Sequence, residues 1–393
     1  MTNTEVLLLA LAVIFAVPFL VWRLTWIGRI APLVVVQIVS GILLGPGVLG
    51  AMFPSLFSAL FGSAIIASLN SMASWAVILF VWVAGLELEL HQLWAARRET
   101  SLTASLALAL PLALGAGAAT LLIQSPGWMG EHAHPWQAAL GIGMACAVTA
   151  LPILVLLMDD FGILHAPLGK RILRYASVDD LAIWIVLAII LLDGERASRQ
   201  AIFLIVLVPM VLGIRWLMPR IGAADRWYVA MIWLILCAWG ADWSGLHYMV
   251  GAFVAGAALD ADWFGQEAIE TLRRNVLVIL MPIFFLSTGL RTSWSGGGLM
   301  IFAGAGLLLL AAVVGKLIGV GIAGRLLGWP KGEGMLIGWL LQTKALIMII
   351  FANILLDKGI IQGGAFTALL LMAVASTMLT TPMARPILRR LQS

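Results

Sequence analysis

The chain has 393 residues, of which 62% are hydrophobic and only 11% carry a charge. This usage excludes an ordinary soluble domain, because apolar runs of about 20 residues, each long enough to cross a bilayer, recur from end to end. We therefore expect one integral membrane domain over residues 1–393, with no soluble domain. The net charge of +4 lies in short loops between apolar runs, so it indicates topology and does not point to a nucleic-acid partner.

The first apolar run, residues 6–22, has no basic residue before it and no clear cleavage site after it, so we expect a retained helix and no signal peptide. From there the apolar runs predict an all-α, polytopic protein of about thirteen transmembrane helices. Cys146 and Cys237 both fall within these runs and offer neither a disulfide framework nor a metal-binding cluster. The predicted spans are 4–22, 30–46, 70–90, 101–123, 136–158, 168–192, 198–218, 227–241, 244–260, 274–290, 299–323, 333–356 and 364–388.

Basic residues are distributed unevenly between the loops. Of the 23 Lys and Arg residues, 17 lie in the odd-numbered connections and the C-terminal end, and only 4 lie in the even-numbered connections. Cytoplasmic loops carry the excess of Lys and Arg in membrane proteins. The distribution predicts an N-terminus outside the cell and a cytoplasmic C-terminus, which requires an odd number of spans.

Two short glycine-containing motifs occur twice in the same order. Residues 41–47 and 84–86 carry them in the first half, and residues 251–256 and 288–290 carry them in the second. Six spans, a linker span and six more would place the halves in opposite orientations, which is the inverted-repeat plan of secondary transporters. We predict a first repeat at about 4–192, a linker helix at about 198–218 and a second repeat at about 227–388. In a chain with 40 glycines, a chance match of these motifs is the alternative.

Two of the expected helices are interrupted at corresponding repeat positions. The fifth span contains Pro152, which lacks a backbone donor and clashes with a preceding helical turn. The twelfth contains three successive polar residues, Gln342, Thr343 and Lys344. Paired interruptions predict crossover helices that form a transporter's binding site. A proline kink in one helix and a snorkelling lysine in the other would account for the same residues.

Asp179 and Asp180 are adjacent carboxylates inside an otherwise uncharged run, residues 175–192. Charges at bilayer depth are costly and indicate a functional site. Counting about 1.5 Å per helical residue from the basic loops places Asp179 and Lys316 at similar depth. Our hypothesis pairs Asp179 with Lys316, while Asp180 presents its oxygens to an alkali cation or a proton. The Thr149 hydroxyl and the unwound carbonyls near residues 147–152 would complete the oxygen shell.

Each of these residues also has a purely structural interpretation. Asp179 and Asp180 would then form a buried ion pair that only fixes helix packing, and Lys316 would snorkel. For Thr343 and Lys344 two roles remain open, one in the substrate path and one in stabilising a helix end. The remaining acidic and His side chains near span ends fit solvated helix ends or loop charges: Glu87, Glu89, Asp242, His247, Asp260 and Asp262.

Several segments carry a family resemblance. They are residues 148–155, 161–164 and 176–182, with further matches at 40–50, 84–88, 250–256 and 281–290. They resemble the monovalent cation:proton antiporter-2 family, which has the sodium/proton exchanger fold. Residues 148–155 especially resemble the plant cation/proton exchanger branch and its bacterial relatives. The resemblance extends over essentially the whole chain.

The resemblance implies the roles of four residues and the mode of movement. The family's ion-binding aspartate falls on Asp180 and its preceding position on Asp179, while the late core lysine falls on Lys316 and the crossover threonine on Thr149. It further implies a homodimer in which a core domain slides against a dimerisation domain. Many relatives carry a glycine and a nearby glutamate after the second crossover's basic residue, which this chain lacks after Lys344. Since the chain ends at Ser393, we expect no nucleotide-binding regulatory domain.

The prediction is a secondary antiporter, and not an enzyme, in a bacterial-type inner membrane. It would exchange Na⁺ or Li⁺ for H⁺, with K⁺ as the alternative cation, and it would need no cofactor beyond the transported ions. An intramembrane aspartyl protease is excluded because its two aspartates must meet from separate helices, whereas Asp179 and Asp180 are adjacent. A cation channel or a non-transporting membrane receptor remains as the alternative from a different class, since either can hold buried charges.

Overall fold

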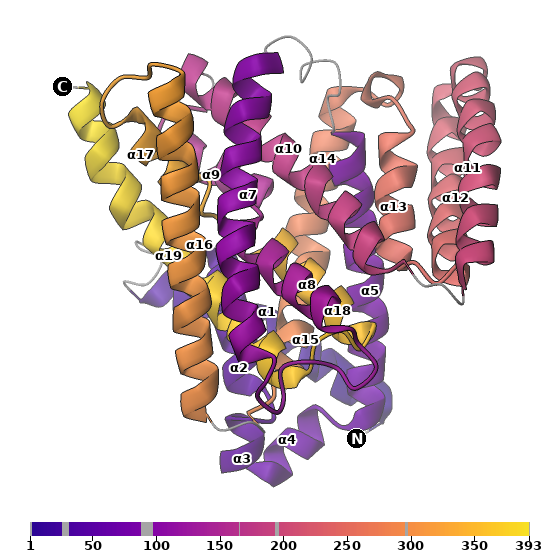
Figure 1. The fold of residues 1–393 in the computed structure, drawn as a ribbon. Coiled ribbons are helices and arrows are strands. Elements are labelled where there is room, and N and C mark those ends of the chain that lie inside the picture. Colours follow the sequence, from indigo (N-terminus) through magenta and orange to yellow (C-terminus); the bar gives the residue numbers. More distant parts are fainter. Residues whose placement is uncertain are drawn as a thin grey trace. The chain divides into compact units, whose positions relative to one another are not determined.

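The structure, a computed structural model, describes residues 2–25, 31–87, 97–164, 166–192, 196–294 and 298–392 (Figure 1). Within these residues the chain folds into helices, with one isolated β-bridge between Met129 and Ile361. The chain divides into two compact units, the first formed by Met1–Gly62, Leu90–Val186 and Thr288–Ser393, and the second by Ser63–Glu89 and Leu187–Ser287. The all-α class expected from the sequence is confirmed.

The first unit contains both ends of the chain and most of the helices. They are α1 (Asn3–Leu24), α2 (Leu33–Leu44), α3 (Leu49–Met52), α4 (Pro54–Leu60), α7 (Arg97–Leu122), α8 (Pro135–Ala147), α9 (Leu151–Asp160), α10 (Pro167–Ile190), α16 (Gly298–Leu326), α17 (Glu333–Leu340), α18 (Ile347–Asp357) and α19 (Gly363–Gln392). The last turn of α10 already belongs to the second unit.

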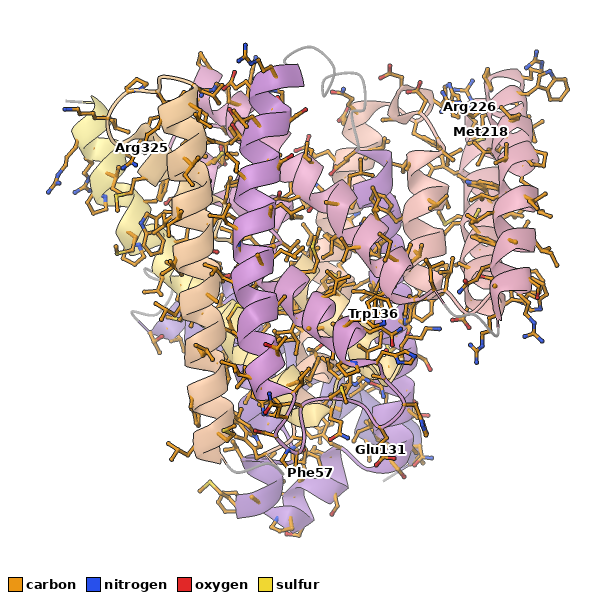
Figure 2. All side chains as sticks on the ribbon, in the orientation of Figure 1. Phe57, Glu131, Trp136, Met218, Arg226 and Arg325 are labelled. Atoms are coloured by element: carbon orange, nitrogen blue, oxygen red, sulfur yellow. The ribbon has the colours of Figure 1, made fainter. Side chains whose placement is uncertain are left out.

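The second unit is formed by α5 (Ser63–Leu86), α11 (Ala197–Leu217), a 3₁₀ turn (Met218–Arg220), α12 (Ala223–Trp243), α13 (Tyr248–Ala257), a second 3₁₀ turn (Ala261–Trp263), α14 (Gln266–Asn275), a π-helical turn (Val276–Leu280) and α15 (Met281–Leu290). Helix α15 leads back into the first unit at Thr288. Figure 2 shows Arg226 and Met218 close together at one end of α12 and α11, where the Arg226 Nε donates to the Met218 carbonyl at 3.1 Å.

Each of the thirteen expected spans is helical in the structure, either as one helix or as a broken pair. Eight helical segments of the described chain are long and apolar enough to cross a membrane. Among the other helices, α13 is too short to meet this criterion, with ten residues. Helix α10 has too many charges, because it carries Asp179 and Asp180 besides basic residues in its first half. The chain is a multi-pass membrane protein.

Helix α5 begins seven residues before the span predicted at 70–90. Its first turns contain serines and an asparagine, which lower the hydropathy and hid the true start. The serine hydroxyls donate to carbonyls of their own helix, as Ser68 does to Ala64 at 3.0 Å and Ser71 to Ala67 at 3.1 Å. Polar residues that bond back onto the helix in this way are compatible with a span.

Helices α7 and α16 lie side by side in the first unit (Figure 1). Glycines make this close packing possible, because a Cβ added at Gly315 would lie 2.4 Å from the Pro111 Cα, and one at Gly319 would lie 2.2 Å from the Leu106 carbonyl oxygen. Small residues four apart let helix backbones approach in membranes. The packing fixes the position of Lys316, the residue that follows Gly315.

The repeated glycine motifs contact one another across the halves of the sequence. In the first unit, a Cβ at Gly289 of α15 would lie 2.3 Å from the Gly41 carbonyl carbon of α2. In the second unit, a Cβ at Gly256 of α13 would lie 2.1 Å from the Trp82 carbonyl oxygen of α5 and 3.0 Å from the Gly85 Cα. Each contact joins the first motif of one half to the second motif of the other, an exchange that an inverted repeat would produce.

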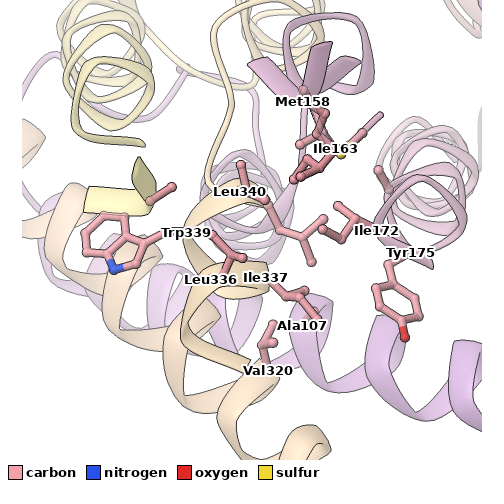
Figure 3. Close-up of a cluster of buried hydrophobic side chains, with 14 of the residues drawn as sticks. Ala107, Met158, Ile163, Ile172, Tyr175, Val320, Leu336, Ile337, Trp339 and Leu340 are labelled. Atoms are coloured by element: carbon pink, nitrogen blue, oxygen red, sulfur yellow. The ribbon is translucent and has the colours of Figure 1, made fainter. Parts of the chain in front are cut away.

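An apolar cluster packs α7, α9, α10, α16, α17 and α19 together within the first unit. Figure 3 shows its members, among them Ala107, Tyr175, Val320 and Leu340. Tyr175 lies one helical turn before Asp179 on α10, and Leu340 is the last residue of α17. The cluster therefore adjoins residues that the sequence predicts to bind ions. Figure 2 shows Arg325 and Glu131 at opposite ends of the first unit.

Candidate ion-binding site

Both interrupted helices predicted from the sequence are broken in the structure. Helix α8 ends at Ala147 and α9 begins at Leu151, while α17 ends at Leu340 and α18 begins at Ile347. The two unwound segments touch, because the Ala150 N–H donates to the Thr343 carbonyl at 2.5 Å. The Thr343 hydroxyl lies 3.4 Å from the Ala150 carbonyl oxygen.

Pro152 does not kink a continuous helix, which was one interpretation of the sequence. It lies at the second position of α9, where a backbone N–H would have no helical partner and its absence costs nothing. The chain is unwound over residues 148–150, before the proline. Pro152 therefore belongs to the first turn of α9, the second half of the broken helix.

Asp179 and Lys316 form an ion pair inside the first unit. The Lys316 Nζ lies 2.9 Å from the Asp179 Oδ2, and the two residues are 0% and 1% exposed, respectively. The same ammonium donates to the Ala147 carbonyl at 2.6 Å, so it is fully buried and does not snorkel. Two charges this deep are tolerated only as a hydrogen-bonded pair, and removing either would leave the other uncompensated.

Lys344 places a second buried side-chain nitrogen at the same helix end. Its Nζ donates to the Cys146 carbonyl at 2.7 Å and to the Val148 carbonyl at 2.9 Å, and the residue is 0% exposed. Together the two lysines bind three successive carbonyls at the end of α8. Such carbonyls have no partner within their helix and carry its negative dipole end. The contacts match the helix-end stabilisation considered for Lys344, and they include two of the carbonyls near residues 147–152 that we expected to bind a cation, those of Ala147 and Val148.

Thr149 bridges the aspartate and the second crossover. Its Oγ1 lies 2.7 Å from the Asp179 Oδ2 and 2.8 Å from the Leu341 carbonyl oxygen. A hydroxyl has one proton, so it donates to one of these acceptors at a time. Thr149 is fully buried.

Asp180 follows Asp179 on α10 and is 8% exposed, more than any of the other three charged groups. Successive helical residues point about 100° apart, so its carboxylate leaves the helix in a different direction from that of Asp179. Lys316 is the counter-charge of Asp179. One bound monovalent cation, or one bound proton, would add the same single positive charge at Asp180.

Gln342 was counted among the three polar residues that interrupt the run, but it was not among the predicted site residues. Its carboxamide is fully buried, and within the described part of the chain neither its oxygen nor its nitrogen has a hydrogen-bond partner. Polarity within an apolar run was the available signal, but it could not show that its neighbours' side chains would be satisfied while its own would not.

The other acidic and His residues considered from the sequence lie in loops or near helix ends. Glu87, just beyond α5, lies 3.5 Å from the Arg273 guanidinium; burial raises the pKa of its carboxyl, and Arg273 opposes this shift. Asp260 accepts from the Asp262 N–H, and His247 caps the start of α13. Glu89 lies outside the described residues, and among those described no three His, Cys, Asp or Glu side chains cluster as metal ligands.

Comparison with known proteins extends over almost the entire chain. The sequence model of a family described as sodium/hydrogen exchanger, transmembrane, matches residues 9–390. The Na⁺/H⁺ antiporter NhaS4 of Synechocystis is 30% identical, over 97% of this chain and 97% of its own length. Cation/H⁺ antiporter 20 of Arabidopsis thaliana is 27% identical over 89% of this chain, which spans only 45% of that relative.

The fold has a solved counterpart. The structure of the sodium proton antiporter MjNhaP1 of Methanocaldococcus jannaschii superposes with a TM-score of 0.60, covering 99% of both chains at 12% sequence identity. At that identity the likeness concerns the fold alone, and the family assignment rests on the sequence comparisons. Together they show that this chain belongs to the transmembrane sodium/hydrogen exchanger family, whose members are transporters.

Proposed function

We propose that this protein is a secondary active antiporter that exchanges a monovalent cation for protons at Asp180. The observation that carries the proposal is the buried Asp179–Lys316 pair, held beside Asp180 where two broken helices cross. Charged groups inside a membrane protein mark ion pathways, and broken helices at corresponding positions mark transporter binding sites. Na⁺ or Li⁺ is the first choice of cation and K⁺ the alternative.

Competition for the Asp180 carboxylate would couple the two fluxes. A cation and a proton each add one positive charge, so either occupant compensates this carboxylate, and the site can reorient when it is filled. An empty, ionised carboxylate would be held in place by the cost of moving it through the apolar interior. Asp179 would tune the site through Lys316, and the Thr149 hydroxyl would offer the cation an oxygen. Release of a proton from Lys316 on cation binding would supply a second proton per cycle.

The proposal also includes the membrane, the orientation of the chain and its oligomeric state. The bias of basic residues supports an inner-membrane protein with its N-terminus outside and its C-terminus in the cytoplasm. The resemblance noted above supports a homodimer, and the division into two compact units supports a core that moves during alternating access.

Transport in reconstituted vesicles tests the central assignment. With a pH dye inside proteoliposomes, addition of Na⁺, Li⁺ or K⁺ should change the internal pH, and Asp180→Asn should reduce the rate to that of protein-free vesicles. Asp160→Asn is the matched control, because it makes the same charge change in an exposed carboxylate at the end of α9. Exchange by Asp180→Asn at the wild-type rate would show that the central assignment is wrong.

The same vesicles separate an exchanger from a channel. A channel would conduct the cation without moving protons, whereas the proposed exchanger moves protons only with the cation. For Lys316→Gln we expect less charge moved per cation, measured as current on a supported membrane. Retained exchange with unchanged charge movement would exclude Lys316 as a proton carrier.

A further inference from the structure

The unwound segment 341–346 has backbone groups that its own helices cannot satisfy. It lies between α17 and α18, and its residues are buried. A buried N–H or C=O without a partner destabilises the fold, and inside a membrane no bulk water is present to replace the partner. Where these groups bond therefore decides the shape of the crossover.

The backbone hydrogen bonds that this segment makes beyond α17 and α18 run in two directions. The Leu341 and Thr343 carbonyls accept from Thr149 and Ala150 of the other crossover. The remaining bonds run to α19, where the Thr377 Oγ1 accepts from the N–H groups of Lys344 and Ala345, each at 3.2 Å. The neighbouring Ser376 hydroxyl donates to the Gln342 carbonyl at 2.8 Å.

Thr377 of another helix satisfies two N–H groups just before the start of α18. Helix α18 begins at Ile347, and its own capping residue, Leu346, has no side-chain oxygen and makes no side-chain capping bond. The Lys344 and Ala345 N–H groups lie before this cap position, so no bond within α18 satisfies them. The hydroxyl that accepts from them comes from α19, and both it and Ser376 are fully buried.

We propose that Ser376 and Thr377 are positioning residues for ion exchange, which hold the second crossover so that Lys344 reaches the end of α8. This inference rests on the proposed function, because it assigns the pair to the same site. The Lys344 backbone is fixed at Thr377, and its ammonium binds the Cys146 and Val148 carbonyls on either side of the Ala147 carbonyl that accepts from Lys316. A change at Thr377 thus reaches the Asp179–Lys316 pair through two ammonium groups.

The test compares two threonines of the same helix. Thr377→Val removes the acceptor and keeps the side-chain shape, and Thr377→Ser keeps the acceptor. Thr380→Val is the matched control, because Thr380 is equally buried and its hydroxyl donates at 3.1 Å to Ser376 of its own helix. In proteoliposomes, Thr377→Val should raise the half-saturating cation concentration about tenfold, the effect of losing about one net hydrogen bond, and shift the pH profile of exchange. Thr377→Ser should restore both, and Thr380→Val should change neither.

Hydrogen exchange provides a second readout that does not depend on transport. Mass spectrometry of the peptide containing residues 341–346 should show faster amide exchange in Thr377→Val than in Thr380→Val. Ser376→Ala, which loses a single bond, applies the same test to a milder change if Thr377→Val does not fold. Equal kinetics and equal amide exchange in the two valine variants would overturn the inference, while the loss of transport in Asp180→Asn would still support the proposed function.

Discussion

The Asp179 carboxylate depends on the Lys316 ammonium, since both are buried and 2.9 Å apart. Lys316→Met would leave a buried carboxylate without its counter-charge, which should reduce the free energy of unfolding by about 3–5 kcal/mol. The double variant Asp179→Leu/Lys316→Met removes both charges and should recover most of that loss, because apolar residues often replace a buried pair without cost. Thermal unfolding of the purified protein, followed by tryptophan fluorescence, measures both effects.

An exposed ion pair serves as the control for that cycle. Arg385 and Asp160 lie 2.6 Å apart with side chains 44% and 59% exposed, so Arg385→Met should cost no more than about 1 kcal/mol. A double variant as unstable as Lys316→Met would show that the destabilisation comes from lost packing around α16 and not from the uncompensated charge.

The residues of this site differ in how far the sequence predicts their roles. Asp179, Asp180 and Lys316 could be predicted because a charge within an apolar run stands out and needs a partner. Thr377 could not, since a threonine inside a long apolar helix gives no sign that it accepts from another segment's N–H groups. The carbonyl contacts of Lys344 also depend on the path of an unwound chain, which periodicity does not describe.

The pair of helices α7 and α16 packs through glycines whose added Cβ atoms would collide with the neighbouring backbone. Gly315→Ala should push α16 away from Pro111 and lower thermal stability by about 1–3 kcal/mol, the usual cost of overpacking. Because Lys316 is the next residue, the exchange rate should fall as well. Stability is measured by thermal unfolding and transport in proteoliposomes.

Two other glycines of α16 are matched controls. Gly306 and Gly321 have no atom within 4 Å of an added Cβ, so Gly306→Ala and Gly321→Ala should retain stability and transport. If all three alanine variants behaved alike, close packing against α7 would not be the reason for the effect at Gly315.

The broken helices were predictable as elements, and their boundaries were not. Pro152 indicated an interruption, but the break precedes it, because a proline is accommodated at the start of a helix as well as it disrupts an interior. The short helices α3, α4 and α14 were not predicted, and a hydropathy pattern has no means of finding helices this short or, in α14, this polar.

For the whole molecule, the predicted orientation can be tested with single cysteines. Asn3 and Arg389 are exposed residues near the two ends of the described chain, and the natural cysteines, Cys146 and Cys237, are buried. In intact bacterial cells, a membrane-impermeant maleimide should label Asn3→Cys and should label Arg389→Cys only after permeabilisation. The wild-type protein is the control and should stay unlabelled. The reverse pattern would contradict the positive-inside assignment.

The repeat is a whole-molecule property that the sequence indicated only weakly. Two glycine motifs in a glycine-rich chain were compatible with chance. In the structure, the Gly289–Gly41 contact of the first unit and the Gly256–Gly85 contact of the second exchange partners between the halves. Such long-range pairing could not be read from spacing, because it joins positions more than 150 residues apart.

The Thr149 hydroxyl has one proton and two acceptors, the Asp179 Oδ2 and the Leu341 carbonyl. While Asp179 is ionised, the hydroxyl can donate to it; a proton on that carboxylate oxygen would instead be donated to Thr149, and the hydroxyl hydrogen would turn to Leu341. The Thr149 hydroxyl therefore has two hydrogen-bonded orientations. In the second orientation the Leu341 carbonyl of the opposite crossover accepts the hydrogen bond, so the charge of Asp179 decides which segment is bonded to Thr149.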